Sequence, residues 1–202
     1  HAYFPIDVTE TDAADQAMLA AIQNFGGLDI LVSNAGAAHA GPMLSISNDE
    51  LRNAFELNFF SHYSFSTEAA KILKNQNRGG QILFNISKQA VNPGKNFGAY
   101  GLPKATTFFL MRQLALELGS DGIRVNGINA DRIRSGLLTD DFISSRAKSR
   151  GVSETEYMAG NLLNKEVKAE HVANAFTSLA CAESTTGHVM TVDGGNIEAS
   201  LR

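Results

Sequence analysis

Short apolar runs alternate with longer stretches of mixed polarity along the 202 residues of this chain. The runs are rich in Val, Ile, Leu and Phe, which is typical of strands buried in a sheet. We expect strands over residues 2–6, 28–33, 81–86, 123–128 and 188–192. We expect helices between them, over residues 12–23, 48–75, 97–118, 154–163 and 169–180. This alternation predicts an α/β fold with a parallel sheet and helices on both of its faces.

Two local signals refine this pattern. Ser47 precedes the expected helix 48–75 and Glu50 follows three residues later, so the two side chains can form a capping box. The polar stretch 135–150 is compatible with either a loop or a helix, and it lies where a lid over an active site is expected. No repeat or linker divides the chain, which predicts a single domain over residues 1–202.

Composition narrows the class of protein. The chain is 44% hydrophobic and 19% charged, as in ordinary soluble globular proteins. A net charge of −4 argues against nucleic acid or an anionic membrane as a partner, since both need clustered Lys and Arg. The N-terminal residues lack a signal-peptide pattern, and Arg112 interrupts the most apolar stretch, 108–118. We therefore expect a cytoplasmic protein whose lone Cys181, in an apolar context, is a small core residue.

The strongest chemical signal is the segment Tyr100-Gly-Leu-Pro-Lys104, near the start of an expected helix. The i, i+4 spacing places both side chains on one helical face. A free tyrosine has a pKa of about 10, so a nearby ammonium is needed to favour the phenolate at neutral pH. Lys104 can supply that charge, and Ser87 at the end of a strand can hold a substrate oxygen. The spacing alone also occurs on helix surfaces.

Further motifs make the chain resemble the short-chain dehydrogenase/reductase family over essentially its whole length. The segment Leu28-Asp-Ile-Leu-Val-Ser-Asn-Ala-Gly36 is similar to the family's strand and Asn-Asn-Ala-Gly turn, with Ser33 in place of the first Asn. Asp7-Val8 is similar to its adenine-side Asp-Val, and Val192-Asp-Gly-Gly195 to its C-terminal motif. The resemblance implies a Rossmann-like, doubly wound sheet and an NAD(P)-dependent oxidoreductase.

The resemblance also implies roles for individual residues. Its catalytic set is Ser87, Tyr100, Lys104 and Asn58, with Asn58 matching a residue that holds a water in the proton relay. Its cofactor-binding set is Asp7, Val8, Asn34, Ala35, Gly36, Tyr100, Lys104, Ile133 and Ser135. Structural alternatives remain open at this stage: Asn34 as a turn cap, Asn58 as a buried amide and Ser87 as a strand-end cap.

One segment departs from the family pattern. Where these enzymes usually have Asn-Pro-Gly after the sixth strand, this chain reads Asn129-Ala-Asp-Arg-Ile-Arg-Ser135. Asp131 thereby adds a carboxylate beside the expected site, or else a charge on a loop surface. We expect Lys88, next to Ser87, to be solvated. The histidines show no ligand spacing, so we expect no metal site.

Several segments narrow the resemblance to the C-terminal dehydrogenase domain of bifunctional rhamnulose-1-phosphate aldolase/lactaldehyde dehydrogenases. They are residues 87–94, 129–135, 162–167, 170–175 and 199–202. This finer resemblance implies a small hydroxyaldehyde or alcohol as substrate and NAD as cofactor, with NADP not excluded. Two alternatives stay open: a general polyol or 3-oxoacyl-type short-chain reductase, and a non-catalytic binding or oligomerisation module. We also expect a homodimer or homotetramer that uses the apolar helices 48–75 and 97–118.

The chain shows no glycine-rich turn that opens the first βα unit of a dinucleotide-binding sheet. By the family's order, residues 2–6 form the third strand, so we expect two earlier βα units, on the order of 60 residues, to lie upstream. On this hypothesis the 202 residues are the C-terminal catalytic portion of a longer enzyme. Alone, they should bind the dinucleotide weakly, show no useful turnover and expose an edge of the strand 28–33.

Overall fold

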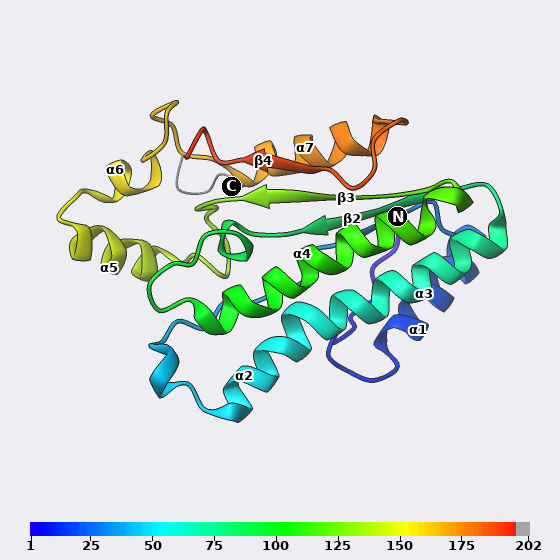
Figure 1. Ribbon diagram of the computed structural model, residues 1–202, viewed down its shortest axis with the longest axis horizontal. Coiled ribbons are helices and arrows are strands. Elements are labelled where there is room, and N and C mark those ends of the chain that lie inside the picture. The colour runs from blue at the N-terminus through cyan, green and yellow to red at the C-terminus, as the bar shows by residue number, and fades with distance from the viewer. Residues whose placement is uncertain (197–202) are drawn as a thin grey trace.

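A computed structural model describes residues 1–196 of the chain, and the tail motif 199–202 lies outside them. Four parallel strands form one sheet in the order β1-β2-β3-β4 (Figure 1). They span β1 Ile30–Ser33, β2 Gly80–Asn85, β3 Ile123–Ala130 and β4 Val189–Val192. These strands confirm four of the apolar runs predicted from the sequence, with boundaries that differ by one or two residues.

Helices cover both faces of the sheet, as the alternating pattern predicts. The α-helices are α1 Ala13–Phe25, α2 Asn48–Phe55, α3 Ser61–Gln76, α4 Gly98–Leu118, α5 Asp140–Arg150, α6 Glu154–Met158 and α7 Ala169–Cys181. A π-helical segment, η2 Glu56–Phe60, joins α2 to α3, and short 3₁₀ turns span η1 Met43–Ser45, η3 Lys88–Ala90 and η4 Gly119–Asp121. Helices α3 and α4 lie on one face and α7 on the other, while α1 packs against α3 (Figure 1).

The alternation of side chains along β2 accounts for the two layers. Ile82 and Phe84 are fully buried and pack with α3 and α4, while Leu83 between them points to the opposite face and packs with α7. A strand buried on both faces needs apolar residues at successive positions, which explains why β2 reads as a continuous apolar run. The fold is a Rossmann-like parallel α/β sheet.

The helix ends follow the local signals. Ser47 and Glu50 form the predicted capping box at the start of α2. The stretch whose state was open contains helix α5, capped by the Thr139 side chain, which accepts from the Phe142 N–H. The helix predicted over residues 154–163 is too long, because α6 ends at Met158. In its last turn the Tyr157 carbonyl accepts from the Arg132 guanidinium at 2.7 Å.

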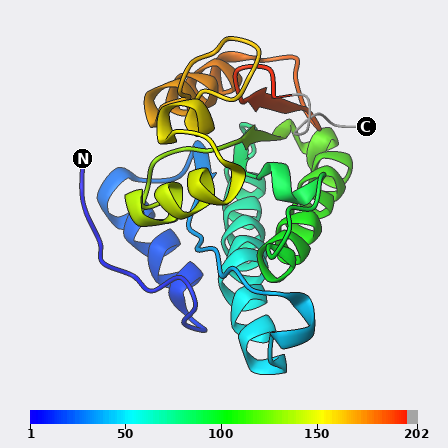
Figure 2. The same cartoon turned by 90° about the vertical axis from the view of Figure 1, so that its left-hand side faces the viewer.

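Two sequence predictions are wrong. Residues 2–6 form no strand, since no other strand among residues 1–196 hydrogen-bonds to them, and Tyr3 is 86% exposed. This segment runs along the outside of the molecule (Figure 2). Cys181 is exposed, because it ends α7 on the side away from the stripe of Val172, Ala175 and Leu179 that packs on the sheet.

The exposed sheet edge is confirmed. Within residues 1–196, β1 pairs only with β2, and its Ile30 and Val32 side chains are 43% and 47% exposed. Because all four strands are parallel, β2, β3 and β4 end on the same side of the sheet as β1. In open parallel sheets, ligands bind at the carboxyl ends of the strands.

Candidate active site

Ser87, Tyr100 and Lys104 meet at the carboxyl end of β2. Ser87 caps the 3₁₀ turn η3 directly after the strand, and its Oγ accepts from the Gln89 N–H at 3.2 Å. Tyr100 and Lys104 lie in the first turns of α4, one turn apart, and are only 8% and 2% exposed. The structure therefore brings together the three residues that the sequence singled out for chemistry.

The environment of Tyr100 does not by itself favour the phenolate. Burial raises the pKa of Tyr100 above its usual value, and a side-chain hydrogen bond with Ser87 partly opposes that rise. The Lys104 Nζ lies 5.9 Å from the centre of the Tyr100 ring. Lys104 is thus the nearby positive charge available to stabilise the phenolate.

Lys104 is held by neutral groups. Its Nζ donates to the Asn85 carbonyl at 3.0 Å and contacts the His62 Nε2 at 3.3 Å. Burial lowers the pKa of Lys104 to about 8. Among the described residues no carboxylate pairs with it, so its ammonium retains one uncommitted donor and an uncompensated charge.

His62 is a part of the site that sequence reasoning missed. Burial, followed by the charge of Lys104, lowers the pKa of His62 to about 3, so its ring is neutral at neutral pH. Because an ammonium can only donate, the His62 Nε2 accepts from Lys104 and the Nδ1 carries the proton. The Nδ1 then donates to the Ser33 Oγ at 2.6 Å. The one signal in the sequence was Ser33 itself, the departure from the Asn-Asn-Ala-Gly pattern.

Asn58 lies in the π-helical segment η2 and is 1% exposed. Such segments often mark functional positions in helices. The Asn58 Nδ2 donates to the carbonyls of Ala37 and Ala54, at 2.9 and 3.1 Å, whereas its Oδ1 has no hydrogen-bond partner among the described residues. The Asn58 backbone carbonyl accepts from Thr107 at 2.8 Å.

Gly36 leaves a gap beside these groups. A Cβ at Gly36 would approach the Asn58 Oδ1 to 2.8 Å and the Lys104 Nζ to 3.5 Å. Any side chain here would crowd the Lys104 ammonium and the Asn58 Oδ1. Asn34, two residues earlier, accepts from the Asn85 Nδ2 at 2.7 Å, and Ala35 between them is exposed.

The other predicted cofactor residues fall into two groups. Ile133 and Ser135 line a pocket together with Ser87 and Tyr100. Asp7 and Val8 lie on a turn near the N-terminus, where the Asp7 carboxylate accepts from Thr9, and neither of them lines this pocket. The structure thus brings Ile133 and Ser135, but not Asp7 and Val8, to the same pocket as Ser87 and Tyr100.

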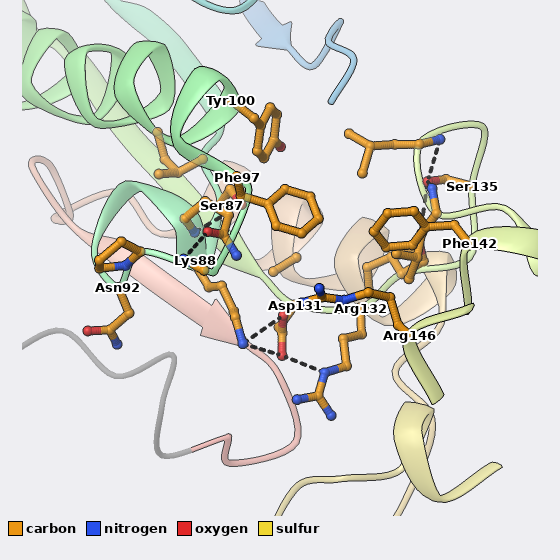
Figure 3. Close-up of a pocket in the computed structure, with 18 of the residues that line it drawn as sticks. Ser87, Lys88, Asn92, Phe97, Tyr100, Asp131, Arg132, Ser135, Phe142 and Arg146 are labelled. Carbon is orange, nitrogen blue, oxygen red and sulfur yellow. Dashed lines mark hydrogen bonds and ion pairs between the residues drawn. The ribbon is translucent and has the colours of Figure 1, made fainter. Parts of the chain in front are cut away.

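The pocket has a volume of about 550 Å³ and a charged wall opposite Tyr100 (Figure 3). The Asp131 carboxylate lies 3.5 Å from the Lys88 Nζ and 3.4 Å from the Arg132 Nε, and it accepts from Asn196 at 2.5 Å. The prediction that Lys88 is solvated is wrong, since its side chain is only 14% exposed. Asp131 stands where the family pattern has glycine, and its ion pair with Lys88 holds that side chain in the pocket wall.

These residues fit the nicotinamide and ribose end of a dinucleotide. Such a group requires space and polar partners. Gly36 leaves the space, the Lys104 ammonium has one uncommitted donor, and the Asn58 Oδ1 has no partner among the described residues. Residues 1–196 contain no cluster of side chains able to hold a metal ion. No helix in that range has the length and apolar character needed to cross a membrane.

The comparisons with known proteins agree with this geometry. A family model described as enoyl-(acyl carrier protein) reductase matches residues 1–196. The chain is 35% identical over 198 residues to the uncharacterized oxidoreductase YuxG of Bacillus subtilis, spanning 94% of this chain but only 29% of that protein. It is 30% identical to L-rhamnose 1-dehydrogenase (NAD(P)(+)) of a Sphingomonas species, spanning 94% and 73% of the two chains.

A solved structure gives the same result. The acetoin dehydrogenase of Enterobacter cloacae superposes with a TM-score of 0.81 at 27% identity, over 96% of this chain and 74% of that one. The family match over residues 1–196, the relatives and the Rossmann-like sheet all point to one family. This chain belongs to the short-chain dehydrogenase/reductase family.

Proposed function

We propose that this chain is the catalytic part of an NAD(P)-dependent oxidoreductase that interconverts a small hydroxy compound and its carbonyl counterpart. The observation that carries the proposal is that Ser87 and Tyr100 line the pocket and share a side-chain hydrogen bond, while the buried Lys104 lies one helical turn from Tyr100, with its Nζ 5.9 Å from the ring centre. Members of this family use NAD(P)(H), and the chain's own residues suit that chemistry.

Each residue has a distinct task in the proposed reaction. The chemistry that a bound nicotinamide supplies is uptake or release of a hydride. The Ser87 hydroxyl holds the substrate oxygen, and the Tyr100 Oη takes the hydroxyl proton during oxidation or returns it during reduction. The Lys104 ammonium stabilises the Tyr100 phenolate in between. An aldehyde that is oxidised must first be hydrated, since only the gem-diol offers both a hydride-bearing carbon and an acidic hydroxyl, whereas an aldehyde that is reduced accepts the hydride directly.

The proposed substrate is a hydroxy compound of the size of lactaldehyde. The resemblance to lactaldehyde dehydrogenase domains favours it, and a relative that acts on L-rhamnose and a structural neighbour that acts on acetoin support a small polyhydroxy or hydroxyketone class. NAD is the cofactor that this resemblance favours, and the name of the rhamnose relative includes both NAD and NADP. A cytoplasmic location is part of the same proposal.

The direct test is a spectrophotometric assay of the full-length protein, because the chain spans only 29% of YuxG. We expect reduction of NAD or NADP with lactaldehyde, propane-1,2-diol or acetoin as substrate. A titration of reduced nicotinamide fluorescence in parallel separates an enzyme from a module that only binds. Cofactor binding without any turnover on this panel would contradict the proposed activity.

We also propose that the protein is a homo-oligomer formed through the faces of α3 and α4. Phe60, Phe109 and Leu116 are 46%, 67% and 79% exposed, an unusual apolar content for solvent-facing positions. Met111, which the sequence suggested for this interface, is fully buried in the core against the sheet. Light scattering at micromolar concentration tests the proposal, and a monomer would contradict it.

A further inference from the structure

The charged side chains that line the active-site pocket are strongly unbalanced. Among the described residues the lining contains five cations and one carboxylate, namely Lys88, Lys95, Arg132, Arg146, Arg150 and Asp131. The whole chain carries a net charge of −4, so this concentration of positive charge is local. A pocket lined by one sign of charge raises the local concentration of ligands of the opposite sign.

Asp131 compensates only part of this charge. It faces both Lys88 and Arg132, whose side chains are 14% and 12% exposed, so two partly buried cations share one carboxylate. Arg132 is further fixed by the Tyr157 carbonyl and stacks on the Tyr157 ring at 4.9 Å. This part of the wall keeps about one excess positive charge where water is scarce.

Arg146 has no compensation among the described residues. It projects from α5, and its guanidinium lies 5.4 Å from the centre of the Phe97 ring and 6.0 Å from that of Phe142. Its Nε is buried without a hydrogen-bond partner in residues 1–196. A buried donor left unmet costs free energy, which an acceptor in the pocket would recover.

We infer that the pocket wall formed by Lys88, Asp131, Arg132 and Arg146 binds an anionic oxygen group, a carboxylate or phosphate, carried by the substrate. The guanidinium of Arg146 provides a planar fork that matches such groups, and the excess charge of the Lys88 and Arg132 pair adds to the attraction. The inference rests on the proposed function and deepens it. The preferred substrate is a small hydroxy compound bearing an acid group, and neutral compounds such as lactaldehyde are poorer substrates.

The position of the wall favours the substrate over the cofactor as the source of the anion. Lys88 directly follows Ser87, the residue proposed to hold the reacting oxygen, and Figure 3 shows Ser87, Lys88 and Asp131 on neighbouring parts of one pocket. Asp7, which the family resemblance places at the adenine end, does not line it. An anion held by this wall therefore shares one pocket with Ser87 and Tyr100, the residues proposed to hold the reacting oxygen and exchange its proton.

The test compares two substrates of one carbon skeleton, 3-hydroxybutyrate and butane-1,3-diol, with the full-length protein. We expect a higher kcat/KM for the acid in the unmodified protein, and a loss of about tenfold or more of that preference, mostly through KM, in Arg146→Met. Arg146→Lys should restore part of it. Lys148→Met, on the same helix and outside the pocket, is the matched control.

The outcomes separate this inference from the proposed function. Equal kcat/KM for acid and diol would overturn the inference and leave the redox function standing. A rise in the KM of NAD or NADP in Arg146→Met, with substrate KM unchanged, would also overturn it, since the wall would then hold a cofactor phosphate. Calorimetry with 3-hydroxybutyrate needs no turnover. Binding that depends on Arg146, found with an inactive protein, would support the inference and contradict the function.

Discussion

Two lysines of the candidate site have very different surroundings. Lys104 is 2% exposed, and its hydrogen-bond partners within residues 1–196 are the neutral Asn85 carbonyl and His62 ring. Lys88 is 14% exposed and faces the Asp131 carboxylate, which it shares with Arg132. The first cation is desolvated without a counter-ion, and the second belongs to an ion cluster.

The difference shows how the same side chain serves two purposes. Because no carboxylate among the described residues offsets burial, the pKa of Lys104 falls to about 8, and its Nζ lies 5.9 Å from the centre of the Tyr100 ring. A carboxylate beside Lys104 would cancel the electrostatic effect of its charge on Tyr100. Lys88 instead holds its place through Asp131, as expected of a group that shapes and charges a binding surface rather than one that tunes a base.

Removal of the Tyr100 hydroxyl should have the largest effect on turnover. Tyr100→Phe in the full-length protein should lower turnover by several orders of magnitude, because only the hydroxyl that exchanges the proton is lost. The free energy of unfolding should change by less than about 1 kcal/mol. Steady-state kinetics and urea unfolding check the two halves of this statement, and activity within about tenfold of the unmodified protein would rule out the assigned role.

Lys104→Met should lower kcat by about a hundredfold and move the rise of rate with pH to higher pH. The sign follows from the loss of a positive charge, which disfavours the phenolate and so raises the pKa of Tyr100. Burial already raises that pKa, and the two effects add. The same substitution at Lys88 should move the profile less, since Asp131 compensates that charge. Profiles of kcat against pH for both variants test the contrast. Equal shifts would remove it.

Breaking the ion cluster should cost stability rather than shift the profile. Asp131→Asn leaves Lys88 and Arg132 without a carboxylate, and the free energy of unfolding should fall by about 1–3 kcal/mol. Asp140→Asn is the control, because its ion pair with Arg134 is largely exposed. Urea unfolding at neutral pH measures both, and an Asp131→Asn variant as stable as the control would show that the cluster is not stabilising.

The last prediction concerns the neutral partner of Lys104 and appears only at acid pH. His62 has a pKa of about 3 in the folded chain and 6.5 as a free side chain, so the unfolded state binds the extra proton between these values. Its contribution to stability is therefore complete above pH 6.5 and declines as the pH falls toward 3. His62→Leu should flatten the acid loss of stability in this window, measured by urea unfolding at several pH values. The exposed His39→Leu variant is the matched control for loss of a histidine.

The sequence by itself determined the elements and the catalytic core. Alternation of short apolar runs with amphipathic stretches is local information, and it was sufficient for β1 to β4, the covered sheet and the capping box at Ser47. The i, i+4 spacing placed Tyr100 and Lys104 on one face, since one turn of helix has the same geometry in any protein. A strand end followed by Ser87 completed the set.

Only the tertiary structure decided the partners of these groups. His62 and Lys104 are 42 residues apart, and Lys88 and Asp131 are 43 apart, so no local period relates either pair. The same holds for Gly36 beside Asn58, and for Cys181, whose exposure depends on which face of α7 meets the sheet. The local sequence shows which bonds a side chain is able to form. The packing of distant elements selects which partner is within reach and how far water is excluded from the contact.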